Sequence, residues 1–422
     1  MSLSLTARIR QITDRVTGRD ESVFAPDLEA HAAAVREEIA GRRVLVAGGA
    51  GTIGAATLLA LVDRNPAEIT VLDPCENNLA ELVRSIRGGA RRFDGELRVQ
   101  PLPYGSRLAA RFVAELPPHD VVLSFAALKH VRSERDPYST LRLLDVNLVE
   151  ADRFLAALRR AGHGARGVFF VSTDKAANPV SLMGASKRIM ELLLWAHTEG
   201  DVASLLDGGT AAPLPRVTTA RFANVAFSDG SLPWAFLQRL EKRQPLAAPR
   251  GVRRYLLSPW EAGDLCLLAA TRAPASHVVV PKLDADGHTV TFPEVAEATL
   301  ACMGLEPAWY DDEAAALAHV EDERARGRYP VVVTRADTSG EKEMEEFVAD
   351  GETAIDAGFV TLSCIAARPT SRDALVDVLR RIERACTGEA AGPSKAEIVE
   401  WLASLVDDLR HRETGTSLDA RL

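Results

Sequence analysis

The chain has 422 residues, of which 47% are apolar and 26% are charged, and this composition excludes a mainly disordered or fibrous protein. Its net charge of −9 argues against a general nucleic-acid binder. No apolar run approaches the roughly 18 residues that span a bilayer, and the N-terminus lacks an apolar core of signal-peptide length. We therefore expect a cytoplasmic protein with no nucleic-acid or membrane partner.

The cysteines and lysines indicate which kinds of site the chain can form. The five cysteines show no CxxC spacing, so neither a disulfide framework nor a metal site is expected. Only seven of the 50 basic residues are lysines. A lysine can lose its proton in a suitable pocket whereas an arginine cannot, so each retained lysine is a candidate for chemistry. They are Lys129, Lys175, Lys187, Lys242, Lys282, Lys342 and Lys395.

Helical periodicity comes first along the chain, over residues 5–16 and 27–39. From residue 43 onward, short and wholly apolar runs alternate with helical patterns. Such alternation predicts an α/β fold with a doubly wound parallel sheet. The predicted strands are 44–47, 69–72, 97–101, 120–127, 167–173 and 217–222, and the predicted helices between them are 55–63, 79–86 and 141–161.

A glycine-rich loop follows the first predicted strand. Its three glycines have GxxGxxG spacing, which lets backbone N–H groups and a helix N-terminus approach a pyrophosphate. An aspartate ends the next strand, where a carboxylate binds the ribose hydroxyls of an adenosine and would repel a 2′-phosphate. The pattern predicts a bound nicotinamide dinucleotide, NAD in preference to NADP; the alternative is a tight turn in a non-binding α/β protein. The predicted cofactor ligands here are Gly48, Gly51, Thr52, Ile53, Gly54 and Asp73.

Two further motifs carry a resemblance to a known family. The first reads Phe-Ala-Ala-Leu-Lys-His-Val over 125–131, and the second combines Ser-Thr-Asp-Lys-Ala over 172–176 with Met-Gly-Ala-Ser-Lys over 183–187. Over about residues 41–300 the chain resembles the Rossmann-fold extended short-chain dehydrogenase/reductases. Within them it resembles the nucleotide-sugar 4,6-dehydratases of polysaccharide biosynthesis, of the UDP-N-acetylglucosamine type. Residues 337–347 also resemble a C-terminal extension of a longer branch of that group.

The resemblance implies a reaction and assigns residues to it. The sugar is oxidised at C4, loses its C5 proton and its C6 hydroxyl, and regains hydride at C6. Asp174 would be the acid at C6 and Lys175 the base at C5, which requires a pKa below the usual 10.4 of a lysine. Thr173 would bind the 4-hydroxyl, and Lys187 would hold the nicotinamide ribose. The alternative for Asp174 and Lys175 is a surface ion pair at a strand end.

One position departs from the superfamily pattern. Most members have a tyrosine four residues before the active-site lysine, whereas this chain has Met183. A thioether cannot accept a proton, so another group must take the proton of the 4-hydroxyl. Three candidates remain open: Thr173 relaying to water, Lys187 itself, or Lys129.

The remaining assignments concern the substrate. By resemblance, Ala126 and Lys129 line the cofactor, and Lys129 with His130 also faces the sugar. Arginine suits bidentate contact with a diphosphate, and the alternative for such a residue is a solvated basic turn. The residues assigned to the nucleotide sugar are Lys129, His130, Asn224, Ser231 and Arg254.

The sequence is predicted to divide into four segments. They are a helical N-terminal extension (1–40), a dinucleotide-binding domain (41–225), a nucleotide-sugar-binding lobe (226–330) and a C-terminal extension with two helices (331–422). By analogy with the family, a homo-oligomer is also expected. The stretch 337–342 is interpreted as a loop, a subunit contact or a lid. Alternatives to dehydration on the same fold are 4-epimerisation, C5-inverting dehydration and 5,6-dehydration, and the non-enzymatic alternative is an inactive dinucleotide sensor or scaffold.

Overall fold

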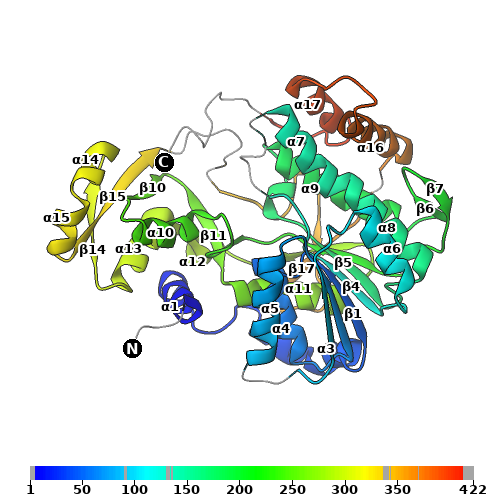
Figure 1. Ribbon diagram of the computed structural model, residues 1–422, viewed down its shortest axis with the longest axis horizontal. Coiled ribbons are helices and arrows are strands. Elements are labelled where there is room, and N and C mark those ends of the chain that lie inside the picture. The colour runs from blue at the N-terminus through cyan, green and yellow to red at the C-terminus, as the bar shows by residue number, and fades with distance from the viewer. Residues whose placement is uncertain are drawn as a thin grey trace.

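The fold was examined in a computed structural model, which describes residues 5–89, 93–129, 134, 136–335, 342, 344–368 and 370–411. A nine-stranded sheet forms the centre of its larger part (Figure 1). Seven strands run parallel in the order β3-β2-β1-β4-β5-β8-β12, and β17 and β16 extend the sheet in antiparallel fashion. This confirms the predicted doubly wound parallel sheet. The strands are β1 (Arg43–Ala47), β2 (Glu68–Leu72), β3 (Glu96–Gln100), β4 (Val121–Ser124), β5 (Gly167–Val171), β8 (Val217–Ala220), β12 (His277–Pro281), β16 (Ala354–Ile355) and β17 (Leu362–Ala366).

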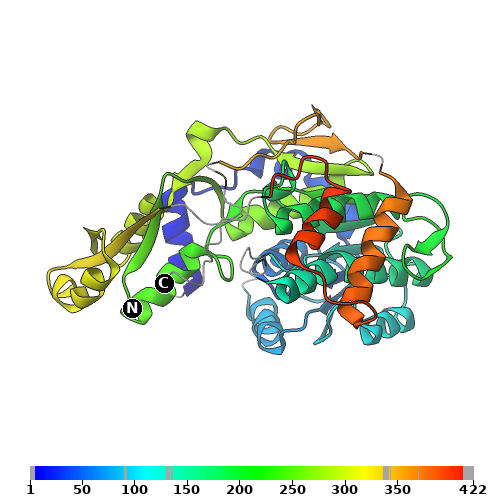
Figure 2. The same cartoon turned by 90° about the horizontal axis from the view of Figure 1, so that it is seen from above.

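Helices cover both faces of this sheet, so strands β2, β4 and β5 are buried along their whole length. One face carries α3 (Ala32–Ile39), α4 (Thr52–Val62), α5 (Glu76–Gly88) and α11 (Pro259–Arg272), with the short α2 (Ala25–Ala30) against α11. The other carries α6 (Arg107–Glu115), α7 (Pro137–Leu144), α8 (Glu150–Ala161) and α9 (Leu182–Ala196). Outside them pack α16 (Arg372–Thr387) and α17 (Lys395–Ala403), the orange and red helices of Figure 2. A hairpin of β6 (Val202–Ser204) and β7 (Gly208–Thr210) leans on α8.

Two element boundaries differ from the sequence prediction. The helix expected from residue 55 begins at Thr52, because Gly51 is extended and already acts as its N-cap. The single helix expected over 141–161 is α7 and α8 joined by a π-helical turn, Asp145–Val149. Such a turn inserts an extra residue into the helix and often accompanies a functional site.

A smaller lobe has its own hydrophobic core, which includes Ile12, Phe236 and Tyr329 (Figure 1). One of its sheets is parallel, with β10 (Leu246–Arg250), β15 (Arg328–Arg335) and β14 (Glu306–Tyr310). The other contains β9 (Asn224–Val225), β11 (Arg253–Leu257) and β13 (Thr289–Thr291). Its helices are α1 (Leu5–Thr17), α10 (Leu232–Glu241), α12 (Ala285–His288), α13 (Phe292–Ala301), α14 (Glu313–Ala318) and α15 (Val320–Ala325).

The chain passes repeatedly between the two parts. Helix α1 packs on α13 of the lobe, whereas α11 and β12, which lie between residues 226 and 330, belong to the large sheet layer. Strand β15 adds to the lobe before β17 returns to the large sheet. Both parts therefore draw on distant stretches of sequence. No helix of the described residues is long and apolar enough to cross a membrane.

Candidate active site

The glycine-rich loop lies between β1 and α4, at the carboxyl end of the sheet. Gly48 has a φ of +69°, and a Cβ added there would lie 2.5 Å from the backbone nitrogen of Ala126. A Cβ at Gly54 would lie 2.5 Å from the carbonyl oxygen of Gly48. Both positions exclude any larger residue, so the loop keeps its backbone close to the N-terminus of α4.

This loop forms one wall of a cavity of about 290 Å³. The opposite wall comes from the ends of β4 and β5, from α9 and from the start of β9. Many of the predicted cofactor, catalytic and substrate residues line this cavity: Gly48, Gly51, Thr52, Ile53, Gly54, Lys129, Thr173, Lys175, Met183, Lys187 and Asn224. Ala126 packs behind Gly48, and His130 lies outside the described residues.

Asp73 lies just outside this lining. Its carboxylate accepts hydrogen bonds from the backbone N–H groups of Ala50, at 3.1 Å, and Cys75, at 2.9 Å. Burial raises the pKa of this carboxyl group, and the two N–H donors partly offset that rise. Asp73 thus braces the glycine-rich loop in this structure, and its contact with a ribose stays a prediction.

The Thr-Asp-Lys motif forms a turn directly after β5. The hydroxyl of Thr173 donates to Asp174 Oδ1 at 2.8 Å. Lys175 Nζ donates to the same oxygen at 3.0 Å and to Asn224 Oδ1 at 3.2 Å. The side chain of Asp174 is only 3% exposed, so this is a buried hydrogen-bonded group and not a surface ion pair.

The pKa of Lys175 contradicts the sequence expectation. Burial would lower it, but the carboxylates of Asp174 and Glu345 attract the ammonium group more strongly and raise the pKa above its usual value. Lys175 therefore holds its proton in this structure. A base at this position needs a partner that can take the proton away.

Lys187 shows the opposite shift. It is buried, and its Nζ donates to the carbonyl oxygen of Val171 at 3.0 Å. Burial lowers its pKa to about 8, against a weak opposing attraction from Glu191. Met183 is also buried, one helical turn earlier on α9, and presents no proton acceptor to the cavity.

The loop that carries Lys129 is fixed by Asn147, in the π-helical turn. The Asn147 amide donates to the Leu128 carbonyl at 3.0 Å and accepts from the Leu128 N–H at 2.9 Å. It also donates to the Ser186 hydroxyl at 3.0 Å, so one residue connects this loop to α9. Burial lowers the pKa of Lys129, and Asp229 opposes that shift.

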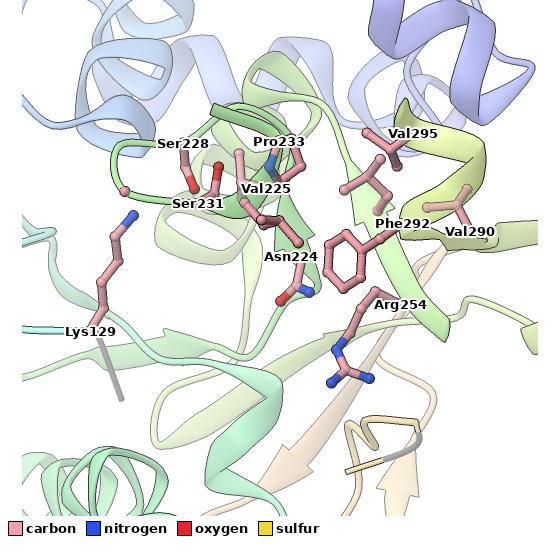
Figure 3. Close-up of a pocket in the computed structure, with 13 residues that line it drawn as sticks. Lys129, Asn224, Val225, Ser228, Ser231, Pro233, Arg254, Val290, Phe292 and Val295 are labelled. Carbon is pink, nitrogen blue, oxygen red and sulfur yellow. The ribbon is translucent and has the colours of Figure 1, made fainter. Parts of the chain in front are cut away.

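A second cavity, of about 220 Å³, adjoins the first and shares Lys129, Asn224, Val225 and Ser228 with it. Figure 3 shows Lys129 on one side of it and Arg254, from β11, on the other. Ser231 also lines it, although its hydroxyl oxygen accepts from the Trp234 N–H and caps α10. All predicted substrate residues that the structure describes thus border one continuous space.

Two contributions were missed by the sequence reasoning. Val290, Phe292 and Val295 form an apolar wall of the second cavity, and nothing in their sequence context marks them. Glu345 places Oε1 3.4 Å from Lys175 Nζ although 170 residues separate the two. The sequence drew attention to Glu345 only through the resemblance of residues 337–347 to a C-terminal extension. Among the described residues, no group of three or more His, Cys, Asp or Glu side chains could hold a metal ion.

A seven-stranded parallel sheet, a glycine-rich loop and a Thr-Asp-Lys turn beside a buried lysine define an extended short-chain dehydrogenase/reductase, the class that contains nucleotide-sugar dehydratases and epimerases. A solved structure agrees with this fold: Pen from Bacillus thuringiensis superposes with a TM-score of 0.59 at 19% identity, covering 82% of this chain and 98% of that one.

Residues 44–362 match the family model described as "Polysaccharide biosynthesis protein", and the chain belongs to that family. It is 30% identical to "Uncharacterized membrane protein MJ1061" of Methanocaldococcus jannaschii over 57% of this chain and 67% of that one. It is 26% identical to the capsular polysaccharide biosynthesis protein CapD of Staphylococcus aureus, over 60% of this chain but only 40% of CapD. It is 25% identical to the inverting UDP-N-acetylglucosamine 4,6-dehydratase of Campylobacter jejuni, over 58% and 67% of the two chains.

Proposed function

We propose that the protein is a nucleotide-sugar 4,6-dehydratase that uses NAD and acts on a UDP-N-acetylglucosamine-like substrate. The observation that carries the proposal is the buried Thr173–Asp174–Lys175 turn, in which the carboxylate of Asp174 accepts hydrogen bonds from Thr173 and Lys175, two residues that line the first cavity. The similarity to a 4,6-dehydratase of Campylobacter jejuni supports it.

The first cavity has the features that a dinucleotide requires. Gly48 and Gly54 leave no room for a Cβ, so backbone N–H groups at the start of α4 are open to a pyrophosphate. Lys187 would hold the nicotinamide ribose and Asp73 the adenosine ribose, and the carboxylate of Asp73 favours NAD over NADP. When bound, the cofactor supplies the acceptor for the C4 hydride and the donor that reduces C6.

The residues of the turn would then move protons. With Met183 unable to act as base, the Thr173 hydroxyl would accept the proton of the 4-hydroxyl and pass its own proton to Asp174 along their hydrogen bond. Asp174, now protonated, would give this proton to the departing C6 hydroxyl. The sequence left open a relay from Thr173 to water, Lys187 or Lys129; we propose Thr173 with Asp174 in place of water as the next acceptor, because their hydrogen bond gives the proton a path to the acid.

The second cavity suits a nucleoside diphosphate. Arg254 offers a cation for the diphosphate, Asn224 a neutral amide, and Phe292 an apolar surface. Because Asn224 also contacts Lys175, the sugar attached to that diphosphate would lie against the catalytic turn.

The first test is to incubate the purified protein with UDP-N-acetylglucosamine, without added cofactor, and to follow the sugar nucleotide by mass spectrometry. We expect the loss of one water, since the hydride removed at C4 is returned at C6. Asp174→Asn should reduce this loss by at least about 100-fold, because an amide cannot supply the proton that the C6 hydroxyl needs.

Two outcomes would contradict the proposal. An unchanged mass with a new isomer would indicate an epimerase, and water loss at the normal rate in Asp174→Asn would exclude Asp174 as the acid. NMR of the product separates a 4-keto sugar from a 5,6-ene and reports the configuration at C5.

A further inference from the structure

A segment of the C-terminal extension, residues 344–352, crosses the catalytic turn. Asn178 follows that turn and has a φ of +44°. Both the amide nitrogen and the amide oxygen of its side chain bind this segment. Its amide donates to Glu346 Oε2 at 3.0 Å, and its carbonyl oxygen accepts from the Asp350 N–H at 2.8 Å. Lys342, just before the segment, donates to the Ala177 carbonyl oxygen at 3.0 Å.

The other end of the segment is fixed by a buried network. Glu352 accepts hydrogen bonds from Arg221, at 2.6 Å, and from Arg188, at 2.6 Å. The carbonyl oxygen of Phe347 accepts a hydrogen bond from Arg221 Nη1 at 3.0 Å. The ring centroids of Phe347 and Tyr255 lie 5.0 Å apart. The residues between these attachments therefore have a defined position over the site.

Glu345 is the residue that this arrangement directs toward Lys175. Its side chain is 3% exposed, and its Oε1 lies 3.4 Å from Lys175 Nζ. Its Oε2 is buried and has no hydrogen-bond partner among the described residues. The charged groups that act on it are Lys175 and Asp174 of the turn, Arg254 of β11 and Lys342 of its own segment. Burial raises the pKa of this carboxyl group; Asp174 adds to the rise, whereas the three cations oppose it.

We propose that Glu345 is a positioning residue that acts through Lys175, accepting the proton that Lys175 must release before it can deprotonate the sugar; this rests on the proposed dehydration. In this step an N–H bond of the Lys175 ammonium group breaks and an O–H bond forms on Glu345. The ion pair becomes an amine and a neutral carboxylic acid, without exchange with solvent. Once Lys175 has taken the C5 proton and returned it to C5, Glu345 gives its proton back.

The physical reason is the cost of keeping two charges in a buried site. An ion pair shielded from water gains little over the neutral pair once the substrate has displaced the remaining solvent. Lys175 is still 23% exposed here, so a bound sugar would remove solvent from it. The proton then moves directly between Lys175 and Glu345, whose Nζ and Oε1 atoms lie 3.4 Å apart here, instead of leaving the closed site.

The kinetic test compares Glu345→Gln with the wild-type protein in its cofactor-bound state, using UDP-N-acetylglucosamine. In the wild type, kcat should be nearly independent of pH across the neutral range, because the proton stays within the pair. In Glu345→Gln, Lys175 must lose its proton to solvent. We expect kcat at pH 7 to fall by about 10- to 100-fold and to rise about tenfold per pH unit, with KM nearly unchanged.

Two variants separate this role from a purely structural one. Glu345→Asp keeps the carboxylate and should restore the flat pH profile with part of the rate. Glu346→Gln removes the neighbouring charge, which is 53% exposed and pairs with Lys342, but keeps an amide oxygen that can accept the hydrogen bond from Asn178; it should leave the shape of the profile unchanged. A Glu345→Gln profile parallel to that of the wild type overturns the proposal.

A second measurement needs no substrate. In NMR spectra of the protein labelled with ¹³C at one carbon of lysine, only seven lysine signals are expected. The signal that disappears in Lys175→Arg is that of Lys175. Glu345→Gln should lower the pKa of Lys175, because one of its two anionic neighbours is lost. An unchanged titration overturns the proposal. A wild-type protein that leaves the sugar nucleotide unaltered overturns the proposed function instead, and the titration still decides whether Glu345 controls this proton.

Discussion

Lys175 and Lys187 line the same cavity, yet their neighbours give them opposite proton affinities. Lys175 faces two carboxylates and its pKa is raised, whereas Lys187 contacts a carbonyl oxygen and a thioether and its pKa falls to about 8. Near neutral pH Lys187 loses its proton far more easily than a surface lysine. The chain thus combines a resting ammonium group with an easily neutralised amine in one site.

The shift at Lys187 predicts a pH-dependent stability. Below pH 8 the folded protein must hold a buried charge, whereas the unfolded chain keeps its proton up to the ordinary pKa of 10.5. The free energy of unfolding should therefore rise between pH 8 and 10.5, by about 3 kcal/mol from this group. Urea denaturation without nucleotide checks this: Lys187→Met should lack that part of the rise and be more stable than the wild type at pH 7. Equal pH dependence in the two proteins would refute the assignment.

Residues that share a motif could be placed from the sequence. Thr173, Asp174 and Lys175 are consecutive, and Lys187 lies on the next helix, so strand and helix periodicity bring them together. Glu345 could not be placed in this way, since its contact depends on how the chain folds back over 170 residues. The pKa of Lys175 was mispredicted because two carboxylates outweigh the effect of burial: Asp174, its neighbour in the sequence, raises the pKa most, and Glu345 adds to the rise.

At the scale of elements, the segment 344–352 is attached by a buried group of two arginines and two glutamates. Arg221 is fully buried and bonds to Glu191 and Glu352, while Arg188 bonds to the same two carboxylates. The arginines lower the pKa of Glu352 to about 2 despite its burial. The group connects α9, β8 and the C-terminal extension.

Removing one charge from this group should be costly. We expect Glu352→Gln to reduce the free energy of unfolding at pH 7 by about 3 kcal/mol, because the buried guanidinium groups of Arg188 and Arg221 each lose one of their two carboxylate partners. Glu321→Gln is the control: this residue is 65% exposed, pairs with the 64% exposed Arg243, and should change stability by less than about 0.5 kcal/mol. Denaturant unfolding measures both effects.

The sign of the pH effect gives an independent check. Glu352 has a lower pKa in the folded than in the unfolded state, so its contribution is complete above pH 4.5 and is lost as the pH falls toward 2. The difference between the wild type and Glu352→Gln should shrink over that range. A difference that stays constant would mean that the charge is not the cause.

Elements with a strong local pattern were predicted best. The alternation over residues 43–222 predicted a parallel sheet, because each helix returns the chain to the same sheet. The sequence could not predict that β12 and β17 join the nine-stranded sheet, because a short apolar run is equally compatible with a strand of the smaller lobe. The π-helical turn was missed because its residues continue the helical pattern.

At the scale of the whole molecule, the C-terminal extension is part of the main fold. Strand β17 pairs with β12 over five residues, and α16 and α17 cover α7 and α9. We expect a chain that ends at residue 341 to show no cooperative unfolding transition, because it exposes that edge and leaves Arg221 without Glu352. A chain that ends at residue 411 keeps every described element and should unfold as the full-length protein does, as followed by circular dichroism.

The distribution of site residues along the chain also has a consequence in time. A polypeptide leaves the ribosome from its N-terminus, so the glycine-rich loop emerges long before Glu345 and Glu352. Until residues 344–352 are released, Lys175 lacks one of its two carboxylate neighbours, and Arg221 has Glu191 but not Glu352 as a counter-charge. Nascent chains that have not yet released residues 344–352 are therefore expected to be inactive, and competence should appear once this segment has emerged and docked.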